Sequence, residues 1–204
     1  MKKHLFVPLL LLLLCYTTAC TSEYKPHNGD IIFQTSLSQQ SIAIQKATNS
    51  KYSHVGIVYL KNNKPFVYEA VEPVKLTPLK KWIARGKGNH FSVKRLVNAE
   101  KILTKEALQR LLKVGKISEG KHYDLYFEWS DDKIYCSELV WKIYKRALNI
   151  EVGELQKMNN FNFSDPVVQK KVHERFGNSI LKDEIVISPA AIFSSNNLVA
   201  VYEQ

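Results

Sequence analysis

The chain has 204 residues, 45% of them hydrophobic and 24% charged, which suits one globular domain with a sizeable core and excludes general disorder. The formal net charge is +10, but the Lys and Arg residues are spread along the sequence. They form no block of basic residues with aromatic residues between them. No nucleic-acid partner is therefore expected. The positive charge indicates either attraction to an anionic envelope surface or simply a solvated basic surface.

Residues 1–19 have the pattern of an export signal. Lys2 and Lys3 form a positive start, and an apolar run follows over residues 5–14. This run is too short to cross a bilayer as a helix, which takes about 20 residues. We therefore expect a removable leader and an exported protein.

Cys20 follows three small residues, 17–19, in an arrangement that resembles a bacterial lipobox, although Thr17 stands where Leu is usual. The resemblance implies that Cys20 is lipidated and anchors the protein in a membrane, facing the periplasm. No acidic residue directly follows Cys20, which favours the outer membrane over the inner one. The alternative is ordinary cleavage after Ala19, which would give a soluble periplasmic protein.

The cysteine count then leaves one free thiol. Cys15 is lost with the leader and Cys20 is acylated, so Cys136 is unpaired in the mature chain. An unpaired cysteine in an exported protein indicates a reactive thiol. The sequence contains no cysteine pair and no His-x-x-x-His spacing, so no metal site is expected, and no cofactor either.

The mature chain divides into a polar tether over residues 20–28 and one domain over 29–204. The Asn62-Asn63 pair predicts the turn of a β-hairpin, and Thr77 and Thr104 are expected to cap helices, with Pro78 as the first helical residue. Strands are predicted at 31–33, 54–60, 65–71, 91–97, 184–187 and 198–202, and helices at 38–47, 77–84, 104–117, 136–148 and 165–176. Because strands and helices do not alternate strictly, the pattern predicts an α+β fold with a mostly antiparallel sheet.

Cys136 stands at the start of the most strongly patterned helix. Apolar residues recur at helical spacing after it, and polar, turn-forming residues 130–133 precede it. The unpaired N–H groups and the positive dipole end of a helix start favour thiolate over thiol, and the thiolate is the nucleophile. The alternative is a small buried residue in the first turn of a helix.

His54 is the histidine best placed to act as a base. With an even-numbered hairpin loop, paired positions have an odd sum, so His54 and Glu69 share one face of the sheet as opposite or diagonal neighbours. Glu69 lies within an apolar run, where a buried carboxylate needs a partner. The alternatives are a strand-end histidine with an ordinary partner and a solvent-facing glutamate.

These segments together resemble a known family. The stretch from Gly120 and Tyr123 to Tyr135-Cys136-Ser137 is similar to the nucleophile segment of NlpC-type papain-like cysteine peptidases. The His54 and Glu69 strands precede the cysteine here, an order that resembles the circularly permuted YiiX/YebB-like branch. One departure is His122, where relatives often have proline.

The resemblance implies a papain-like cysteine peptidase fold, circularly permuted, with an antiparallel sheet packed on the helix that bears the nucleophile. It implies a catalytic triad in which Cys136 is the nucleophile, His54 the general base and Glu69 its orienter. It also implies that Tyr123, Ser53 and Tyr52 contribute to substrate binding.

The function that follows is a cell-envelope cysteine hydrolase, an amidase or peptidase, that cleaves an amide through a thioester on Cys136. A lipid acyl hydrolase or acyltransferase of the lecithin-retinol-acyltransferase-like type is one alternative, and a non-catalytic envelope binding protein is another. The expected partner is a peptide-like or lipid-linked small substrate, and the oligomeric state is left open.

We expect the walls of the substrate cleft to come from residues 50–53, 72–77 and 123–132. These segments are rich in Tyr, Ser, Asp and Lys, and Tyr126, Phe127 and Trp129 add rigid aromatic surface. Such walls predict a small, charged, peptide-like group rather than an acyl chain.

Overall fold

The structure is a computed structural model that describes residues 23–177 and 183–203, so the predicted leader and Cys20 lie outside the described residues. Its centre is a six-stranded sheet in the order β4-β3-β2-β1-β5-β8, and every neighbouring pair of strands is antiparallel. The strands are β1 (Ile31–Gln34), β2 (His54–Lys61), β3 (Lys64–Glu69), β4 (Lys75–Pro78), β5 (Ser92–Leu96) and β8 (Leu198–Glu203). The predicted α+β fold with an antiparallel sheet is confirmed.

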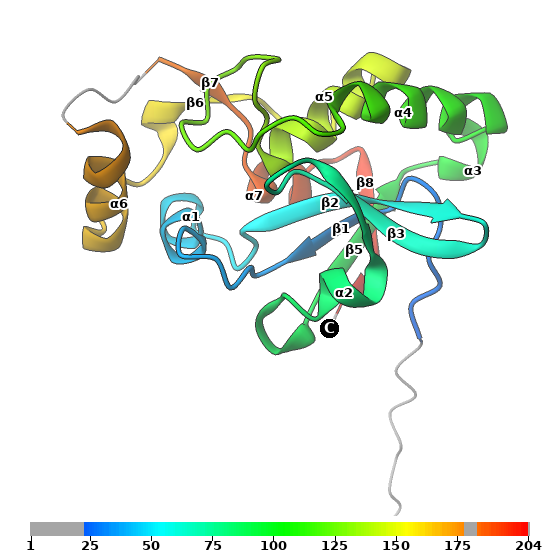
Figure 1. The fold of residues 1–204 in the computed structure, drawn as a ribbon, viewed down its shortest axis with the longest axis horizontal. Coiled ribbons are helices and arrows are strands. Elements are labelled where there is room, and N and C mark those ends of the chain that lie inside the picture. Colours follow the sequence, from blue (N-terminus) through cyan, green and yellow to red (C-terminus); the bar gives the residue numbers. More distant parts are fainter. Residues whose placement is uncertain (1–22, 178–182, 204) are drawn as a thin grey trace, which may run out of the picture.

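Helices cover both faces of the sheet (Figure 1). The long helices α4 (Lys105–Ser118) and α5 (Cys136–Leu148) lie on one face, where they enclose the larger apolar core. The short helix α2 (Leu79–Ile83) lies on the other face, where Trp82 is fully buried in a smaller core. The sheet is therefore buried on both sides around β2.

At one end of the molecule, helix α1 (Ser41–Thr48) lies beside helix α6 (Pro166–Phe176) (Figure 1). The remaining elements are short: α3 (Ala99–Ile102), α7 (Pro189–Phe193), the strands β6 (Gln156–Lys157) and β7 (Ile185–Val186), and the 3-10 turns η1 (Lys87–Asn89) and η2 (Met158–Asn160). Within the described residues, no helix has the length and apolar character needed to cross a membrane.

The strongest local predictions are confirmed. Asn62 and Asn63 join β2 to β3 with left-handed φ angles of 51° and 60°, the conformation of a tight hairpin turn. Thr104 caps α4 by accepting the Ala107 N–H at 3.3 Å. Helix α5 begins at Cys136, as the polar residues before it indicate.

The prediction for Thr77 and Pro78 is wrong. Both residues lie in β4, where Thr77 pairs with Val67 of β3, and α2 begins only at Leu79. The Thr77 hydroxyl donates to the Glu69 carboxylate at 2.5 Å and does not cap the helix. A buried, charged carboxylate is a strong hydrogen-bond acceptor. The Thr77 hydroxyl therefore binds Glu69 rather than a backbone N–H at the start of α2.

Candidate active site

The hairpin of β2 and β3 brings His54 and Glu69 together as diagonal neighbours. Ile57 lies opposite Tyr68, so the next pair in register is Gly56 and Glu69, with His54 two residues further along β2. A Cβ on Gly56 would lie 2.4 Å from the Val67 side chain and 3.5 Å from the Glu69 Cβ. Glycine at position 56 therefore permits the close approach of Val67 in β3, and so supports the pairing that places Glu69 beside His54.

Glu69 is fully buried, and three side chains hold its carboxylate. His54 Nε2 lies 2.6 Å from Oε2, while Oε1 accepts hydrogen bonds from Thr77 at 2.5 Å and from Arg85. Burial alone would raise the pKa of Glu69, but the hydrogen bond and charge of His54, together with Thr77 and Arg85, lower it below its usual value. The carboxylate is therefore charged at neutral pH.

His54 lies between this carboxylate and Cys136. Because Nε2 is engaged by Glu69, Nδ1 is the ring nitrogen left for the hydrogen bond with the Cys136 thiol. Trp82 stacks on the ring, with centroids 5.8 Å apart and planes at 25°. Burial works against the charged imidazolium, but the hydrogen bonds and charges of Cys136 and Glu69 outweigh it and raise the pKa of His54 to about 9.

Cys136 is the first residue of α5 and is buried beside the start of β2. Burial raises the pKa of the thiol, but the hydrogen bond and charge of His54 and further hydrogen bonds from the Val55 N–H and the Tyr123 hydroxyl lower it overall. The first turn of α5 adds the positive end of the helix dipole. A lowered thiol pKa beside a raised imidazole pKa describes a thiolate–imidazolium pair.

Tyr123 joins the site to a network that the sequence did not reveal. Its buried hydroxyl accepts a hydrogen bond from Gln40 Nε2 at 2.9 Å, and Gln40 Oε1 in turn accepts from Arg175 of α6 at 2.5 Å. Burial, and the charge of Cys136, raise the pKa of Tyr123 well above its usual value, so the phenol keeps its proton. Gln40 and Arg175 carry no motif, and only the docking of α6 beside α1 brings them here.

Tyr52 and Ser53 occupy different positions from Tyr123. The Tyr52 hydroxyl lies 2.7 Å from the Ser92 hydroxyl, and its ring packs on Phe193 in the core. The Ser53 hydroxyl lies 2.6 Å from that of Ser41 and ties the start of β2 to α1. These contacts support the strand that carries His54, and neither residue lines the pocket beside Cys136.

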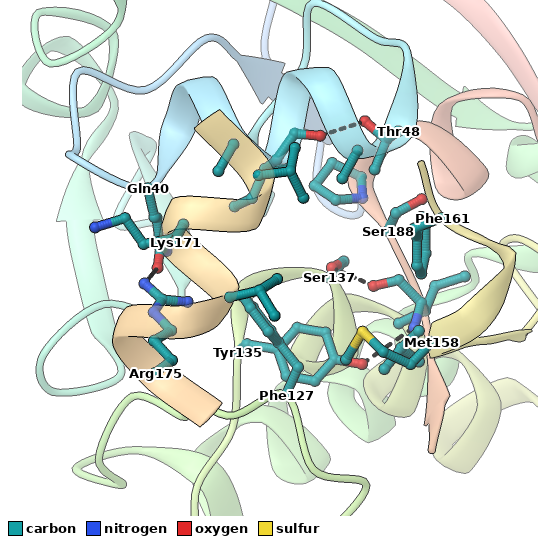
Figure 2. Close-up of a pocket in the computed structure, with 18 of the residues that line it drawn as sticks. Gln40, Thr48, Phe127, Tyr135, Ser137, Met158, Phe161, Lys171, Arg175 and Ser188 are labelled. Atoms are coloured by element: carbon teal, nitrogen blue, oxygen red, sulfur yellow. Dashed lines mark hydrogen bonds between the residues drawn. The ribbon is translucent and has the colours of Figure 1, made fainter. Parts of the chain in front are cut away.

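That pocket is lined in part by residues of α1 and α6 and has a volume of about 110 Å³, and Cys136, Ser137 and Tyr123 form part of its wall. Figure 2 shows Arg175, Lys171 and Gln40 along one side, Met158 and Phe161 on the opposite side, and Tyr135 and Phe127 below. Most of the lining is apolar. Of the three segments expected to form the walls, residues 123–132 contribute Tyr123 and Phe127. Residues 50–53 and 72–77 take no part, so the expectation is wrong for these two segments, and residues of α1 and α6 line the pocket instead.

Comparisons with known proteins agree with the resemblance seen in the motifs. Residues 25–202 match the model of a family described as permuted papain-like amidase enzyme, YaeF/YiiX, C92 family. The chain is 47% identical over 195 residues to YiiX of Escherichia coli strain K12, a protein described as uncharacterized, with 96% of this chain and 95% of that protein covered.

A solved structure is also similar. The crystal structure of yiiX from Escherichia coli O157:H7 matches with a TM-score of 0.85 and 49% identity, over 89% of this chain and 99% of that one, and is described as a metalloprotein. In the parts of this chain that the structure describes, no group of three or more His, Cys, Asp or Glu side chains is placed to hold a metal ion. The described residues therefore offer no three-ligand site of these side chains for such a metal.

Proposed function

This chain belongs to the permuted papain-like amidase family, and we propose that it cleaves an amide through a thioester on Cys136. The family supports a cysteine hydrolase with amidase activity. The cleavage takes two half-reactions, in which Cys136 and His54 have separate tasks.

In the first half-reaction, the Cys136 thiolate attacks the amide carbonyl carbon and forms a C–S bond. The C–N bond breaks, and His54 gives its proton to the leaving amine. In the second, neutral His54 takes a proton from water, the water oxygen attacks the thioester, and the C–S bond breaks. The products are a free amine and a carboxylic acid, and Cys136 and His54 return to their starting ion pair.

The observation that carries the proposal is the chain of contacts from Cys136 through His54 to Glu69. The 2.6 Å contact between His54 Nε2 and Glu69 fixes the ring orientation and leaves Nδ1 directed at the thiol. Glu69 keeps its own place through Thr77 and Arg85. A base held by a third group, next to a nucleophile of lowered pKa, is the arrangement that nucleophilic catalysis requires.

Charge that develops on the carbonyl oxygen needs donors near the nucleophile. The first turn of α5 leaves backbone N–H groups without helical partners beside Cys136. The Tyr123 hydroxyl is hydrogen-bonded to the Cys136 sulfur. We assign the stabilisation of the oxyanion to these donors. The raised pKa of Tyr123 suits this task, because a phenol that keeps its proton remains a donor.

The proposed location is the cell envelope, with the domain anchored through lipidated Cys20 and facing the periplasm. Lys2, Lys3, the apolar run over 5–14 and the small residues before Cys20 support this proposal.

Intact-mass measurement during turnover of small acyl amides tests the chemistry. Wild-type protein should accumulate a species heavier by one acyl group, and that mass should be absent from Cys136→Ser protein and from His54→Ala protein. Cys136→Ser protein should keep the wild-type melting temperature to within a few degrees, because the replacement is nearly isosteric. His54→Ala protein should melt at a lower temperature while remaining folded, because the change removes a buried ring and a partner of buried Glu69. Amide cleavage that continues in Cys136→Ser protein would refute the proposal.

A further inference from the structure

Basic residues without acidic partners gather on the face of the sheet that α2 covers. Residues 73–99 contain seven Lys and Arg residues and no Asp or Glu. Three of the seven are bound within the domain; these are Arg85, Arg95 and Lys94, which bind Glu69, Asp30 and the Phe193 carbonyl. The other four, Lys75, Lys80, Lys81 and Lys87, are exposed, and none of them forms an ion pair or a side-chain hydrogen bond with a described residue.

The fold places these four lysines on one surface, which we call the basic face. Lys80 and Lys81 belong to α2, whose apolar residues point into the smaller core, so the two lysines point outward. Lys87 begins η1, the turn that follows α2. Lys75 of β4 lies opposite Glu69 in register and therefore shares its face of the sheet.

The acidic side chains on this face of the sheet do not cancel the charge of the lysines. Asp30 and Glu69 are fully buried, and each is already bound by an arginine: Asp30 by Arg95 at 2.6 Å, and Glu69 by Arg85. The charge of the four lysines is therefore directed to solvent, where it attracts anions.

The N-terminal segment leaves the domain on the same side. The Tyr24 ring packs on Phe91 at 5.8 Å and its hydroxyl donates to Asp30 at 2.7 Å, so Tyr24 joins the smaller core that α2 covers. Figure 1 shows α2 and the first described residues on the same side of the sheet. The four residues from Tyr24 back to Cys20 span at most about 14 Å when fully extended. A lipid on Cys20 therefore holds this side of the domain close to the membrane.

We propose that the basic face binds the anionic phospholipid headgroups of the membrane and so fixes the orientation of the domain on it. The inference rests on the proposed envelope location and does not depend on the chemistry of Cys136. Each lysine near an anionic surface strengthens binding about fivefold, so four of them give a dissociation constant on the order of millimolar. Binding of this strength orients an anchored domain but does not retain the protein in the membrane fraction without its lipid.

The test uses the mature chain, residues 20–204 with Cys20→Ser, so that no lipid contributes to binding. Vesicles of phosphatidylcholine alone, and vesicles that also contain phosphatidylglycerol, are titrated to millimolar lipid, and bound protein is measured by co-sedimentation. The protein should bind only the vesicles with phosphatidylglycerol at about 0.1 M salt. It should be released at about 1 M salt, where the Debye length falls from about 10 Å to about 3 Å.

Lys80→Gln/Lys81→Gln protein should bind the phosphatidylglycerol vesicles about 25-fold more weakly than wild type, a factor of about five for each lysine. Lys113→Gln/Lys116→Gln protein is the matched control. Both control lysines are exposed on α4, which lies on the opposite face of the sheet, and neither pairs with a described residue. The control loses the same net charge and should bind as wild type does. Because all four substituted side chains are exposed, both variants should keep the wild-type melting temperature.

Three outcomes would overturn the basic face. Equal losses in the two double variants would show that net charge, and not this surface, attracts the vesicles. Equal binding to vesicles with and without phosphatidylglycerol would show that headgroup charge plays no part, and absence of binding would remove the interaction itself. Polyphosphate that binds wild-type protein more tightly than the vesicles do, and loses that binding in the α2 variant, would replace the membrane with a soluble polyanion.

The envelope location is tested separately, by membrane fractionation of the protein with its own Cys20. A chain that is lipidated at Cys20 but shows no vesicle binding would keep the location and lose the basic face. A chain that binds the vesicles through the α2 lysines but carries no lipid would keep the basic face and lose the anchor.

Discussion

Arg175 and Gln40 lie 135 residues apart in the sequence, yet the Arg175 guanidinium donates to Gln40 Oε1 at 2.5 Å. This bond sets the orientation of the Gln40 amide, because the oxygen is taken and Nε2 must face Tyr123. The Tyr123 hydroxyl accepts that N–H, so its own proton is directed to the Cys136 sulfur. A helix near the C-terminal end thereby orients a donor at the nucleophile.

Removing the Tyr123 hydroxyl should therefore raise the pKa of the Cys136 thiol. A hydrogen bond to a charged group contributes about 1.5–3 kcal/mol, so Tyr123→Phe should shift the thiol pKa upward by about one unit or more. The rate of iodoacetamide labelling against pH measures this shift. Tyr126→Phe is the control, because Tyr126 belongs to the same loop but is 47% exposed. An identical labelling curve for wild-type and Tyr123→Phe protein would show that the hydroxyl does not stabilise the thiolate.

The pair of Cys136 and His54 predicts a defined window of activity against pH. The lowered pKa of Cys136 means that the thiolate forms below the usual range of a free cysteine, and activity rises as that proton leaves. The pKa of His54, raised to about 9, means that activity falls as the pH passes about 9, when the imidazolium loses the proton needed by the leaving amine. The two apparent values belong to the coupled pair. A profile of kcat/KM that keeps rising above pH 9 would contradict this assignment.

Glu69→Gln should lower activity without abolishing it. An amide oxygen still accepts from the His54 N–H and orients the ring, but the negative charge that supports the imidazolium is lost. A loss in kcat of up to about 10⁴-fold is expected, the cost known for changing the orienting carboxylate of a catalytic triad to an amide. The alkaline limb of the pH profile should also move to lower pH, because the charge of Glu69 contributes to the raised pKa of His54.

Glu72→Gln is the matched control for this variant. Glu72 is exposed and binds His122 and the Tyr123 N–H outside the triad, so the alkaline limb should stay in place. A loss of activity in Glu69→Gln with an unmoved alkaline limb would indicate that Glu69 acts only in folding.

Local chemistry explains what the sequence predicted well. The two-residue Asn62-Asn63 turn means that paired positions of β2 and β3 have an odd sum. This alone places His54 and Glu69 on the same face of the sheet. Whether they were opposite or diagonal depended on the register, which the turn residues left open. The helical period after Cys136 and the polar residues before it were enough to locate the start of α5.

The remaining parts of the site depend on contacts between distant segments. Thr77 had the local pattern of a cap, but its bond to Glu69 exists only once β3 and β4 pair. Arg85 reaches the same carboxylate from beyond the end of α2. Part of the pocket wall comes from α1 and α6, and no periodicity or turn motif in the sequence predicts that these two helices pack together. Only the 123–132 segment was correctly expected at the pocket.

The predicted lipid anchor depends on the Cys20 thiol. Cys20→Ser removes the thiol that lipidation would modify, and the mature domain should then leave the membrane fraction. Stable anchoring takes more than one acyl chain, so loss of the modified residue should release nearly all of the protein. The domain begins several residues after Cys20 and makes its own core, so the released protein should melt at the wild-type temperature.

Cys15→Ser provides the control, because Cys15 lies inside the predicted leader and is absent from the mature chain. That variant should fractionate with membranes as wild type does. Immunoblotting of osmotic-shock and membrane fractions, with intact mass of the purified N-terminus, measures both outcomes. If wild-type protein appears in the osmotic-shock fraction with an unmodified N-terminus at Cys20, the lipid-anchor prediction is wrong. The leader is then removed by ordinary cleavage after Ala19.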